Sequence, residues 1–183
     1  MARLAQPVPS QTAFVEVRQS AMLKTPLVSR GRYERPQRDV LVRRVQAPQA
    51  EVATLAAGQV TVQRGQGPVR RFELSRAPEL AGLQEGFGAL LDGELAPLQQ
   101  RFTLAASGSQ AQWTLQLVPR RAELATRLRQ LTLHGRHGEL DCIVSTPPRG
   151  AAQYTVVGER AAALATAPAD LGALDALCRG DVP

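Results

Sequence analysis

The side chains best suited to chemistry in this chain lie close together at His134, His137, Asp141 and Cys142. Histidine, cysteine and carboxylate side chains ligate metals, and a histidine beside a carboxylate can transfer protons. Their spacing matches no zinc pattern, however, and places His134 and Cys142 on two strands joined by a turn with His137 at its tip. We interpret the group as a polar hairpin, and we expect no metal, no cofactor and no catalytic residue.

Other catalytic motifs are missing from the sequence. No glycine-rich phosphate loop follows an expected strand, and neither a G-x-S-x-G elbow nor a His-Glu pair at helical spacing is present. The carboxylates are scattered along the chain. These observations favour a protein that is not an enzyme.

Arg35 is a second candidate functional residue. On an expected strand over residues 27–35 it shares a face with Leu27, Gly31 and Tyr33, which is the apolar face. A guanidinium group that points into an apolar interior costs several kcal/mol unless it is satisfied. The alternative is an arginine at a strand end whose head group reaches water. The alternation of side chains along a strand is compatible with both interpretations.

The elements that must position these residues are strands. Apolar and polar residues alternate in short segments such as Arg71–Leu74 and Trp113–Leu117, and a period of two places every second side chain on one face. A sheet with one apolar face must bury it, either by closing on itself or by taking a lid and a ligand. The pattern predicts eleven antiparallel strands, at about 12–23, 27–35, 38–46, 50–57, 59–64, 69–74, 99–107, 110–118, 129–134, 139–145 and 152–158.

Two segments depart from this pattern. Residues 78–98 carry apolar side chains at mostly helical spacings, with four interspersed glycines that weaken a rigid helix. The segment is interpreted either as a movable lid or as a plain helix that covers the core. Residues 159–169 form an Ala-rich stretch that we interpret as a linker, and 170–178 are expected to form a short helix.

Composition limits the kinds of binding partner and cellular location that we expect for the chain. The chain has 183 residues and a net charge of +6, and its aromatic content is only 4%. Its arginines are spread along the chain with few aromatic residues beside them, so nucleic-acid binding is not expected. No stretch approaches the roughly 18 to 20 apolar residues that span a bilayer. Met1–Ser10 has no apolar core, so an intact secretory signal is not expected there.

The order of several landmarks resembles the periplasmic outer-membrane lipoprotein carriers called LolA. Phe14 opens a strand, and the segment from Gly31 through Tyr33 to Arg35-Pro36 is similar to the family's strand end. The other landmarks are Leu55-x-x-Gly58, Trp113–Pro119, and Leu128–Leu133 followed by Gly138. The chain differs in lacking Trp and Tyr after Gly58 and in having Pro147-Pro148-Arg149-Gly150 where the family has D-x-x-G. It is interpreted as a divergent member.

The resemblance implies a mainly β fold, an incomplete antiparallel barrel of about eleven strands with a helical lid. It implies a half-barrel at 12–158 with its lid at about 76–98, preceded by a residual N-terminal segment at 1–11. The Ala-rich linker and short helix at 159–183 form a C-terminal extension that is unlike the typical carrier. In the family, the arginine before proline holds the lid closed through hydrogen bonds to its backbone, and Arg35 matches it. The residues expected to line the ligand site are Leu27, Tyr33, Phe72, Leu74, Phe87, Leu90, Leu91, Trp113, Leu115 and Leu117.

The function implied is that of a periplasmic carrier and chaperone, with its signal peptide absent from this chain. Its hydrophobic cargo would be lipoprotein acyl chains or a lipid such as an aryl polyene. An inner-membrane donor would supply the cargo and an outer-membrane acceptor would receive it, with transient membrane contact, and a monomer is expected. Because the periplasm is oxidising, the two cysteines are expected to form a disulfide between Cys142 and Cys178. The alternative is two unrelated thiols.

Two other classes of function stay open. One is a non-catalytic module of a lipid or polyene biosynthetic complex, which would use the apolar face to hold a protein partner. The other is an acyl-processing enzyme that uses His134, His137 or Asp141. The first predicts a stable complex without extractable lipid, and the second predicts turnover that depends on the hairpin histidines.

Overall fold

A single antiparallel sheet dominates the computed structural model, which describes residues 7–19, 25–74, 96–164 and 171–180. Its eleven strands confirm the predicted mainly β fold. They lie in the order β6-β5-β4-β3-β2-β1-β11-β10-β9-β8-β7. Their bounds are β1 Ser10–Arg18, β2 Leu27–Gln37, β3 Val40–Ala47, β4 Glu51–Ala56, β5 Gln59–Arg64, β6 Arg70–Glu73, β7 Phe102–Gly108, β8 Trp113–Pro119, β9 Gln130–Arg136, β10 Glu139–Thr146 and β11 Gln153–Val157.

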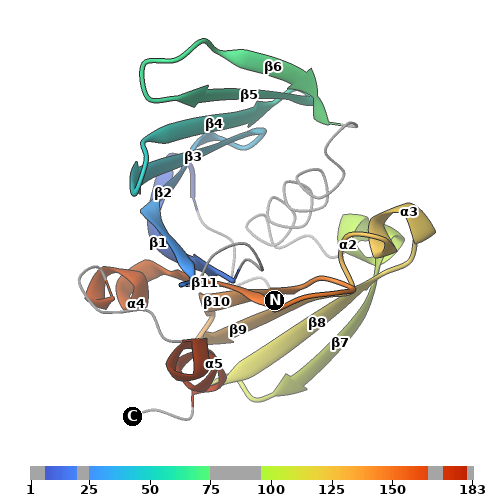
Figure 1. Ribbon diagram of the computed structural model, residues 1–183. Coiled ribbons are helices and arrows are strands. Elements are labelled where there is room, and N and C mark those ends of the chain that lie inside the picture. Colours follow the sequence, from blue (N-terminus) through green and yellow to red (C-terminus); the bar gives the residue numbers. More distant parts are fainter. Residues whose placement is uncertain (1–6, 20–24, 75–95, 165–170, 181–183) are drawn as a thin grey trace.

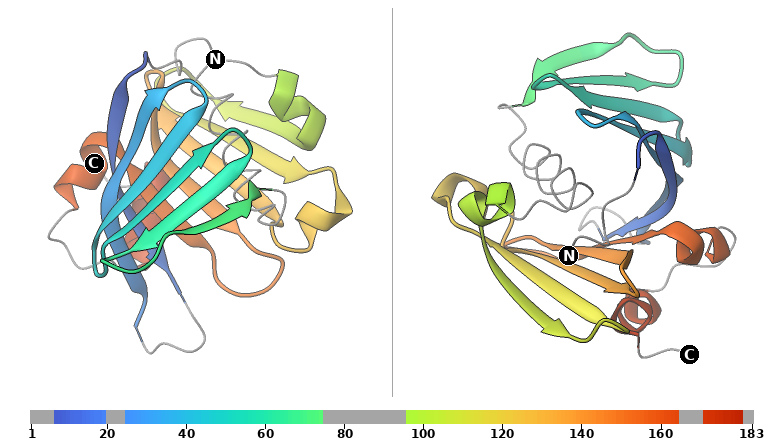
Figure 2. Two further views of the ribbon diagram at one scale, coloured as in Figure 1. Left: turned by 90° about the horizontal axis from the view of Figure 1, so that it is seen from above. Right: turned by 180° about the vertical axis from the view of Figure 1, so that it is seen from behind.

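The strand order divides the sheet into two meanders. Strands β1 to β6 pair in sequence, strands β7 to β11 pair in sequence, and β1 pairs with β11 to join them. The joined sheet curves into an arch whose two ends, β6 and β7, do not meet (Figures 1 and 2). The fold is therefore an open half-barrel with an inner and an outer face.

Two glycines allow close contacts between neighbouring strands. At Gly31 the register of β2 against β3 shifts, and a Cβ atom there would lie 1.9 Å from the carbonyl oxygen of Arg44. At Gly135 the ring of Trp113 takes the place of a side chain, since a Cβ atom would lie 2.2 Å from Trp113 Cζ2. Any larger residue at either position would push backbone or ring aside.

Four helices are described, and they lie in two places. Helices α2 (Ala96–Arg101) and α3 (Ala122–Ala125) stand beside the free end of the second meander, whereas α4 (Gly158–Ala163) and α5 (Leu171–Arg179) lie on the outer face (Figure 1). Two predicted boundaries were wrong. Residues 99–101 belong to α2 and not to a strand, and the start of the expected linker is α4, because alanine favours helix and Ala161 packs against the sheet.

Pro36 does not end its strand as expected, because β2 continues to Gln37. The register of β2 against β3 shifts between Glu34 and Gln37, so Pro36 occupies a point where the ladder is already irregular. A proline is tolerated in a strand at such an irregularity, since its missing N–H removes no regular ladder bond. Strand β1 ends at Arg18, whereas the predicted strand extended to residue 23, and residues 20–23 of that prediction lie outside the described ranges. The other strand bounds agree with the prediction to within three residues.

Both faces of the sheet are apolar near its centre. In β1 the side chain of Phe14 points to the inner face, while Val15 and Val17 point to the outer face, and all three are buried. The outer residues pack with helices α4 and α5 in an outer cluster of Val15, Val17, Cys142, Val144, Val156, Ala161, Leu174 and Cys178. The alternation of apolar and polar residues predicted strands with only one buried face. The central strands are instead buried on both faces.

Candidate functional site

Two apolar clusters cover the inner face of the sheet. The first consists of Phe14, Tyr33, Leu41, Val45, Leu55, Val60, Leu74 and Val157, with Val62 and Phe72 partly buried beside it. The second consists of Leu98, Phe102, Leu115, Leu117, Leu124, Leu131, Leu133 and Ile143, with Leu104, Trp113 and Leu128 beside it. Leu140 packs against both clusters, so together they form one apolar inner face that extends across the two meanders.

The structure places most of the expected lining residues on this face. Tyr33, Phe72 and Leu74 lie in or beside the first cluster, and Trp113, Leu115 and Leu117 lie in or beside the second. Leu27 is half-buried on the same face of β2 and belongs to neither cluster. Phe87, Leu90 and Leu91 lie outside the described residues, as does most of the expected lid. Whether any of these side chains touches a ligand remains a proposal.

Four charged side chains of the inner face are connected to one another by ion pairs. We call Glu16, Arg43, Glu51 and Arg64 the inner ladder, because ion pairs connect them in that order across the first meander. Nη2 of Arg43 donates to Oε1 of Glu16 at 3.0 Å, and Nη1 of Arg43 lies 3.5 Å from Oε1 of Glu51. Nε of Arg64 donates to Oε2 of Glu51 at 2.6 Å.

Strand pairing shows why these residues share the face. Residues directly opposite in an antiparallel pair point to the same side. Arg43 stands opposite Tyr33, and Glu51 stands opposite both Val45 and Arg64. Since Tyr33 and Val45 belong to the inner apolar cluster, the ladder must lie on the inner face.

Two aromatic rings support the centre of the ladder. The guanidinium carbon of Arg43 lies 4.9 Å from the ring centroid of Phe14, whose ring is 4.7 Å from that of Tyr33. Burial, reinforced by the charge of Glu16, raises the pKa of Tyr33 to about 12, although its hydrogen bond with Arg43 opposes the shift. Burial lowers the pKa of Arg43, but the attraction to Glu16, Tyr33 and Glu51 and the hydrogen bond with Tyr33 together outweigh it, and the net shift is upward. Tyr33 is therefore neutral and Arg43 charged at neutral pH.

Arg35 is buried at the end of the same face of β2, with an exposed fraction of 3%. Its Nη2 donates to the backbone carbonyl of Arg38 at 3.2 Å. The alternative of an arginine that reaches water is therefore wrong. The contact with a lid that the resemblance implies would involve residues outside the described ranges, so that role stays a proposal.

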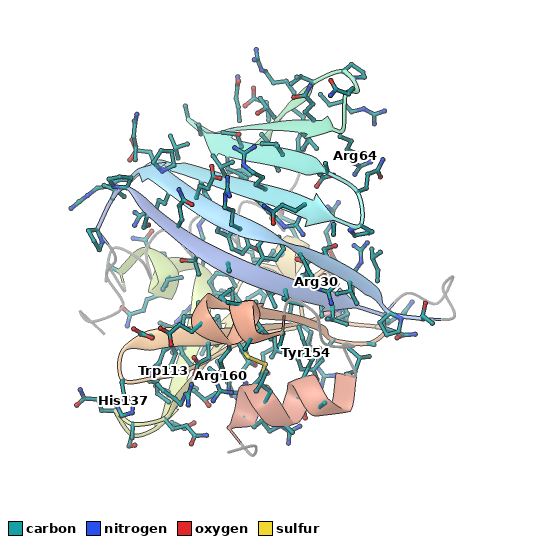
Figure 3. All side chains as sticks on the ribbon, turned by 90° about the vertical axis from the view of Figure 1, so that its left-hand side faces the viewer. Arg30, Arg64, Trp113, His137, Tyr154 and Arg160 are labelled. Atoms are coloured by element: carbon teal, nitrogen blue, oxygen red, sulfur yellow. A yellow bond between two sulfur atoms is a disulfide. The ribbon has the colours of Figure 1, made fainter. Side chains whose placement is uncertain are left out.

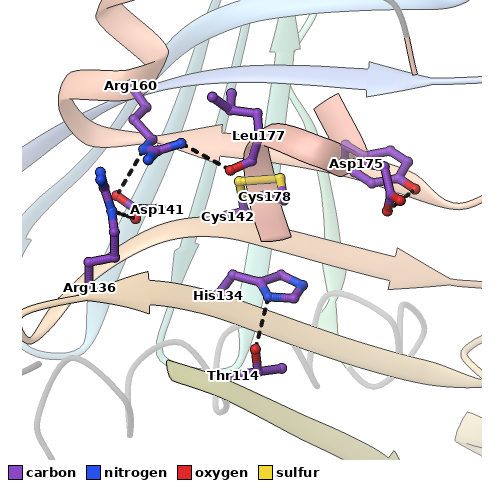
Figure 4. Close-up of a disulfide and its surroundings, with 10 residues drawn as sticks. Thr114, His134, Arg136, Asp141, Cys142, Arg160, Asp175, Leu177 and Cys178 are labelled. Atoms are coloured by element: carbon purple, nitrogen blue, oxygen red, sulfur yellow. Dashed lines mark hydrogen bonds and ion pairs between the residues drawn. A yellow bond between two sulfur atoms is a disulfide. The ribbon is translucent and has the colours of Figure 1, made fainter. Parts of the chain in front are cut away.

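In the hairpin group, His134, Asp141 and Cys142 lie on the outer side of the sheet, and His137 lies in the turn between β9 and β10. His134 Nδ1 is 3.1 Å from Oγ1 of Thr114, and burial lowers its pKa (Figure 4). Asp141 pairs with Arg136, whose Nε is 2.8 Å from Oδ2. In the described part of the chain no three His, Cys, Asp or Glu side chains are placed to hold a metal ion. Asp141 and Cys142 of this group connect β10 to the helices, through the ion pair with Arg160 of α4 and the disulfide to Cys178 of α5.

The two cysteines are joined in the structure. Cys142 of β10 and Cys178 of α5 form a disulfide across a sequence separation of 36 residues (Figures 3 and 4). Around it, Nη1 of Arg160 donates to the Leu177 carbonyl at 2.9 Å, and Tyr154 donates to Asp175 at 3.0 Å. The bond fastens the last helix to the outer face of the sheet, as predicted from the cysteine pair.

Comparison with known proteins decides the family. The family model described as "Outer membrane lipoprotein carrier protein LolA-like" matches residues 1–182. The chain belongs to this family. A solved LolA superfamily protein from Nitrosomonas europaea is similar at 10% identity, with a TM-score of 0.42 and coverage of 86% of this chain and 87% of that one. No curated protein matches the sequence.

Membership in the LolA-like family confirms the divergent LolA-like assignment suggested by the landmarks at Phe14, Arg35-Pro36 and Trp113–Pro119. It identifies the half-barrel as a carrier fold that is associated with lipid and lipoprotein binding. Within the described ranges, no helix combines the length and apolar character needed to cross a membrane.

Proposed function

We propose that this LolA-like protein carries a hydrophobic cargo on the inner face of its half-barrel and does not catalyse a reaction. One observation carries the proposal: two apolar clusters, linked through Leu140, form a continuous inner face across both meanders. Several apolar side chains on it are only half-buried, among them Val62, Phe72, Leu104 and Trp113. Apolar surface of this kind, arranged on the inside of a curved sheet, suits a flexible acyl chain.

The energy for binding would come from burial. Each methylene group that moves from water to an apolar site contributes about 0.8 kcal/mol. A chain of sixteen carbons could therefore gain roughly 10 kcal/mol, from which the cost of ordering the chain and opening the protein is subtracted. No chemical step is needed, because release requires only a competing apolar site.

The finer assignment is part of the same proposal. The protein would act in the periplasm as a monomer, take lipoprotein acyl chains or a lipid such as an aryl polyene from an inner-membrane donor, and deliver it to an outer-membrane acceptor. The family supports this direction of transport. The net charge of +6 supports transient contact with anionic membrane surfaces.

Probe displacement tests the carrier function. Delipidated protein should bind an apolar fluorescent naphthylamine in a saturable way, and palmitate should displace it. Leu104→Asn places an amide on the inner face and should weaken probe binding about tenfold, the equivalent of losing about 1.4 kcal/mol of apolar burial. Val118→Asn on the neighbouring strand is the matched control, since Val118 is 43% exposed on the outer face.

Two results would contradict the carrier function. The first is that the protein binds the probe no more strongly than an unrelated protein does. The second is that none of the acyl chains tested displaces the probe. Native mass spectrometry of protein purified from its own host adds an independent measurement, because a carrier should retain some lipid. A stable protein complex without lipid would favour the accessory-module alternative.

A further inference from the structure

The inner face is chemically divided along the sheet. In β7 to β10 the inner positions, from Phe102 to Ser145, carry no charged side chain, and Leu115, Leu117 and Leu133 are fully buried there. In β1 to β6 the same face holds the four charges of the inner ladder, together with Arg18 opposite Leu27, the buried Arg35, and Arg70 opposite Val62. A cargo that spans the face would meet a purely apolar half and a half with organised charge.

A site for acyl chains alone gains nothing from such a ladder. The side chains of Glu16, Arg43 and Glu51 are only 15%, 20% and 22% exposed. Removing charges from water to this degree carries a cost that ion pairs only partly offset, and apolar residues of similar size are often at least as stabilising. The charges therefore indicate that the cargo has a polar part.

The ladder opens toward solvent at one end. The exposed fraction of the side chains rises from 15% at Glu16 to 67% at Arg64. Glu51 engages only Nε of Arg64, so the N–H groups of its two terminal nitrogens remain for a ligand. Oε1 of Glu51 lies 3.5 Å from Arg43, a longer ion pair than the others. The Glu51–Arg64 pair is thus the part of the ladder that a ligand would meet.

Charge balance restricts the polar part. The ladder alternates negative and positive from Glu16 to Arg64, and its two carboxylates cancel its two guanidinium groups. A ligand with one charge would be attracted to one member of the end pair and repelled by the other. A ligand with both charges continues the alternation, with a phosphate on Arg64 and an ammonium group on Glu51.

We propose that the Glu51–Arg64 end of the inner ladder binds the head group of a zwitterionic phospholipid whose acyl chains lie on the apolar inner face. The inference rests on the proposed carrier function and adds the class of cargo. It also assigns the two meanders different tasks: β7 to β10 hold the acyl chains, and β1 to β5 select the head group.

The test compares three lipids with identical acyl chains as competitors for the naphthylamine probe. They are phosphatidylethanolamine, which is zwitterionic, phosphatidylglycerol, which is anionic, and diacylglycerol, which has no charged head group. In the wild-type protein, phosphatidylethanolamine should displace the probe at a concentration about two- to fivefold lower than the other two, as expected for solvent-screened charged contacts. The ratio between lipids is the readout, because it does not depend on how well a variant folds.

Two variants should change that ratio in opposite ways. Glu51→Gln leaves the ladder with one excess positive charge, so phosphatidylglycerol should become the best competitor. Arg64→Gln removes the phosphate ligand, so phosphatidylethanolamine should lose its advantage over diacylglycerol. Glu34→Gln is the matched control: it removes a carboxylate that pairs with arginines on the outer face, and it should leave the order of lipids unchanged.

The outcomes separate the two proposals. If all three lipids displace the probe equally, or if Glu51→Gln leaves the order unchanged, the head-group site is wrong while the carrier function stands. If no lipid displaces the probe from the wild-type protein, the carrier function itself fails. A preference of the wild-type protein for phosphatidylglycerol would overturn the zwitterionic assignment.

Discussion

The inner and outer faces of this one sheet are both apolar, yet they are covered in different ways. On the outer face Val15, Val17 and Val156 pack against two helices, and a disulfide holds the second helix in place. On the inner face the apolar clusters lie beside paired charges, and several apolar side chains remain half-buried. One face has a covalently fixed cover, whereas the other retains half-buried apolar side chains.

The difference teaches how a binding face can be kept apolar without losing the fold. A face that must accept a ligand cannot be fully covered by side chains of the protein itself. The stability of the fold must therefore come from contacts in other parts of the molecule. In β1 the neighbours Phe14 and Val15 serve the two faces separately, since alternate residues of a strand point to opposite sides. Stability should depend mainly on the outer face, and ligand binding on the inner face.

The largest expected effect is on the outer face. Replacing both cysteines by Cys142→Ala and Cys178→Ala should lower the free energy of unfolding by about 3 to 4 kcal/mol, the loop-closure entropy of a link across roughly 36 residues. Probe affinity at the inner face should stay within about twofold, because the bond lies on the opposite side of the sheet. Urea unfolding and probe titration measure the two quantities.

A control establishes the starting state of that experiment. Thiol titration of unreduced, denatured wild-type protein from an oxidising compartment should find no free thiol, since both cysteines are bonded. Two free thiols per chain would contradict the disulfide that fastens α5 to the outer face. A parallel loss of probe affinity in the double variant would show that the two faces are coupled.

A second substitution should damage both faces at once. Gly31→Ala would place a Cβ atom 1.9 Å from the Arg44 carbonyl oxygen, so β2 and β3 must separate. The expected loss is about 2 to 3 kcal/mol in unfolding free energy, as for an overpacked core site. Because Arg43 reaches Glu16 across β2, probe and lipid binding should also weaken. Gly150→Ala is the control, since its Cβ atom would meet nothing and only its positive φ is strained. An effect of Gly31→Ala no larger than that of the control would contradict the prediction.

Sequence reasoning recovered the strands because period-two alternation is a local property that survives in the fold. It placed Tyr33 and Trp113 on the inner face for the same reason. It missed the outer cluster, because β1 reads as one alternating strand and does not reveal that both of its faces are buried. That burial depends on α4 and α5, which return to the sheet from the far end of the chain.

The inner ladder was missed for a related physical reason. Glu16 lies two residues from Phe14 and therefore on the same face of β1, but its partner Arg43 stands two strands away in the sheet. An isolated charge on a strand is usually solvated, and only the register of β1, β2 and β3 brings the two side chains together. Pairings between strands are long-range information that the pattern of one strand does not contain.

A smaller effect is expected at Arg35, on ligand release. Arg35→Leu should slow release of the probe or a lipid by about tenfold, roughly 1.4 kcal/mol, if the buried guanidinium stabilises the empty form of the carrier. The side chain is buried at the strand end and donates to the Arg38 carbonyl. Arg38→Leu is the control, because it keeps that carbonyl and changes an exposed side chain.

Stopped-flow dilution gives the release rate, and hydrogen exchange over residues 76–98 reports the expected lid. Unchanged release together with unchanged exchange in Arg35→Leu would contradict a role of Arg35 in closing the carrier. Slower release with unchanged exchange would instead place the effect in the ligand site itself.

The smallest effect should come from the charged group on the outer face of the first meander, where exposure weakens each ion pair. Nε of Arg32 lies 2.5 Å and Nε of Arg44 2.9 Å from Oε1 of Glu34, and Nη2 of Arg44 lies 3.3 Å from Oε2. The hydrogen bond from Arg44, and to a smaller extent the one from Arg32, lowers the pKa of Glu34 from 4.5 to about 2. A lowered folded-state pKa means that the carboxylate stabilises the protein above the unfolded-state pKa and that this stabilisation is lost as pH falls toward 2.

Glu34→Gln should therefore lower the free energy of unfolding by only about 0.5 to 1 kcal/mol at pH 7, the range measured for solvent-screened pairs. The difference from wild type should stay constant between pH 7 and about 5 and then shrink between pH 4.5 and 2, where the unfolded chain binds the proton first. Urea unfolding at pH 7, 5 and 3 measures it. A difference that grows as the pH falls would contradict the sign, and a difference of several kcal/mol would mean that the outer charges are as costly to disturb as the buried contacts of the inner face.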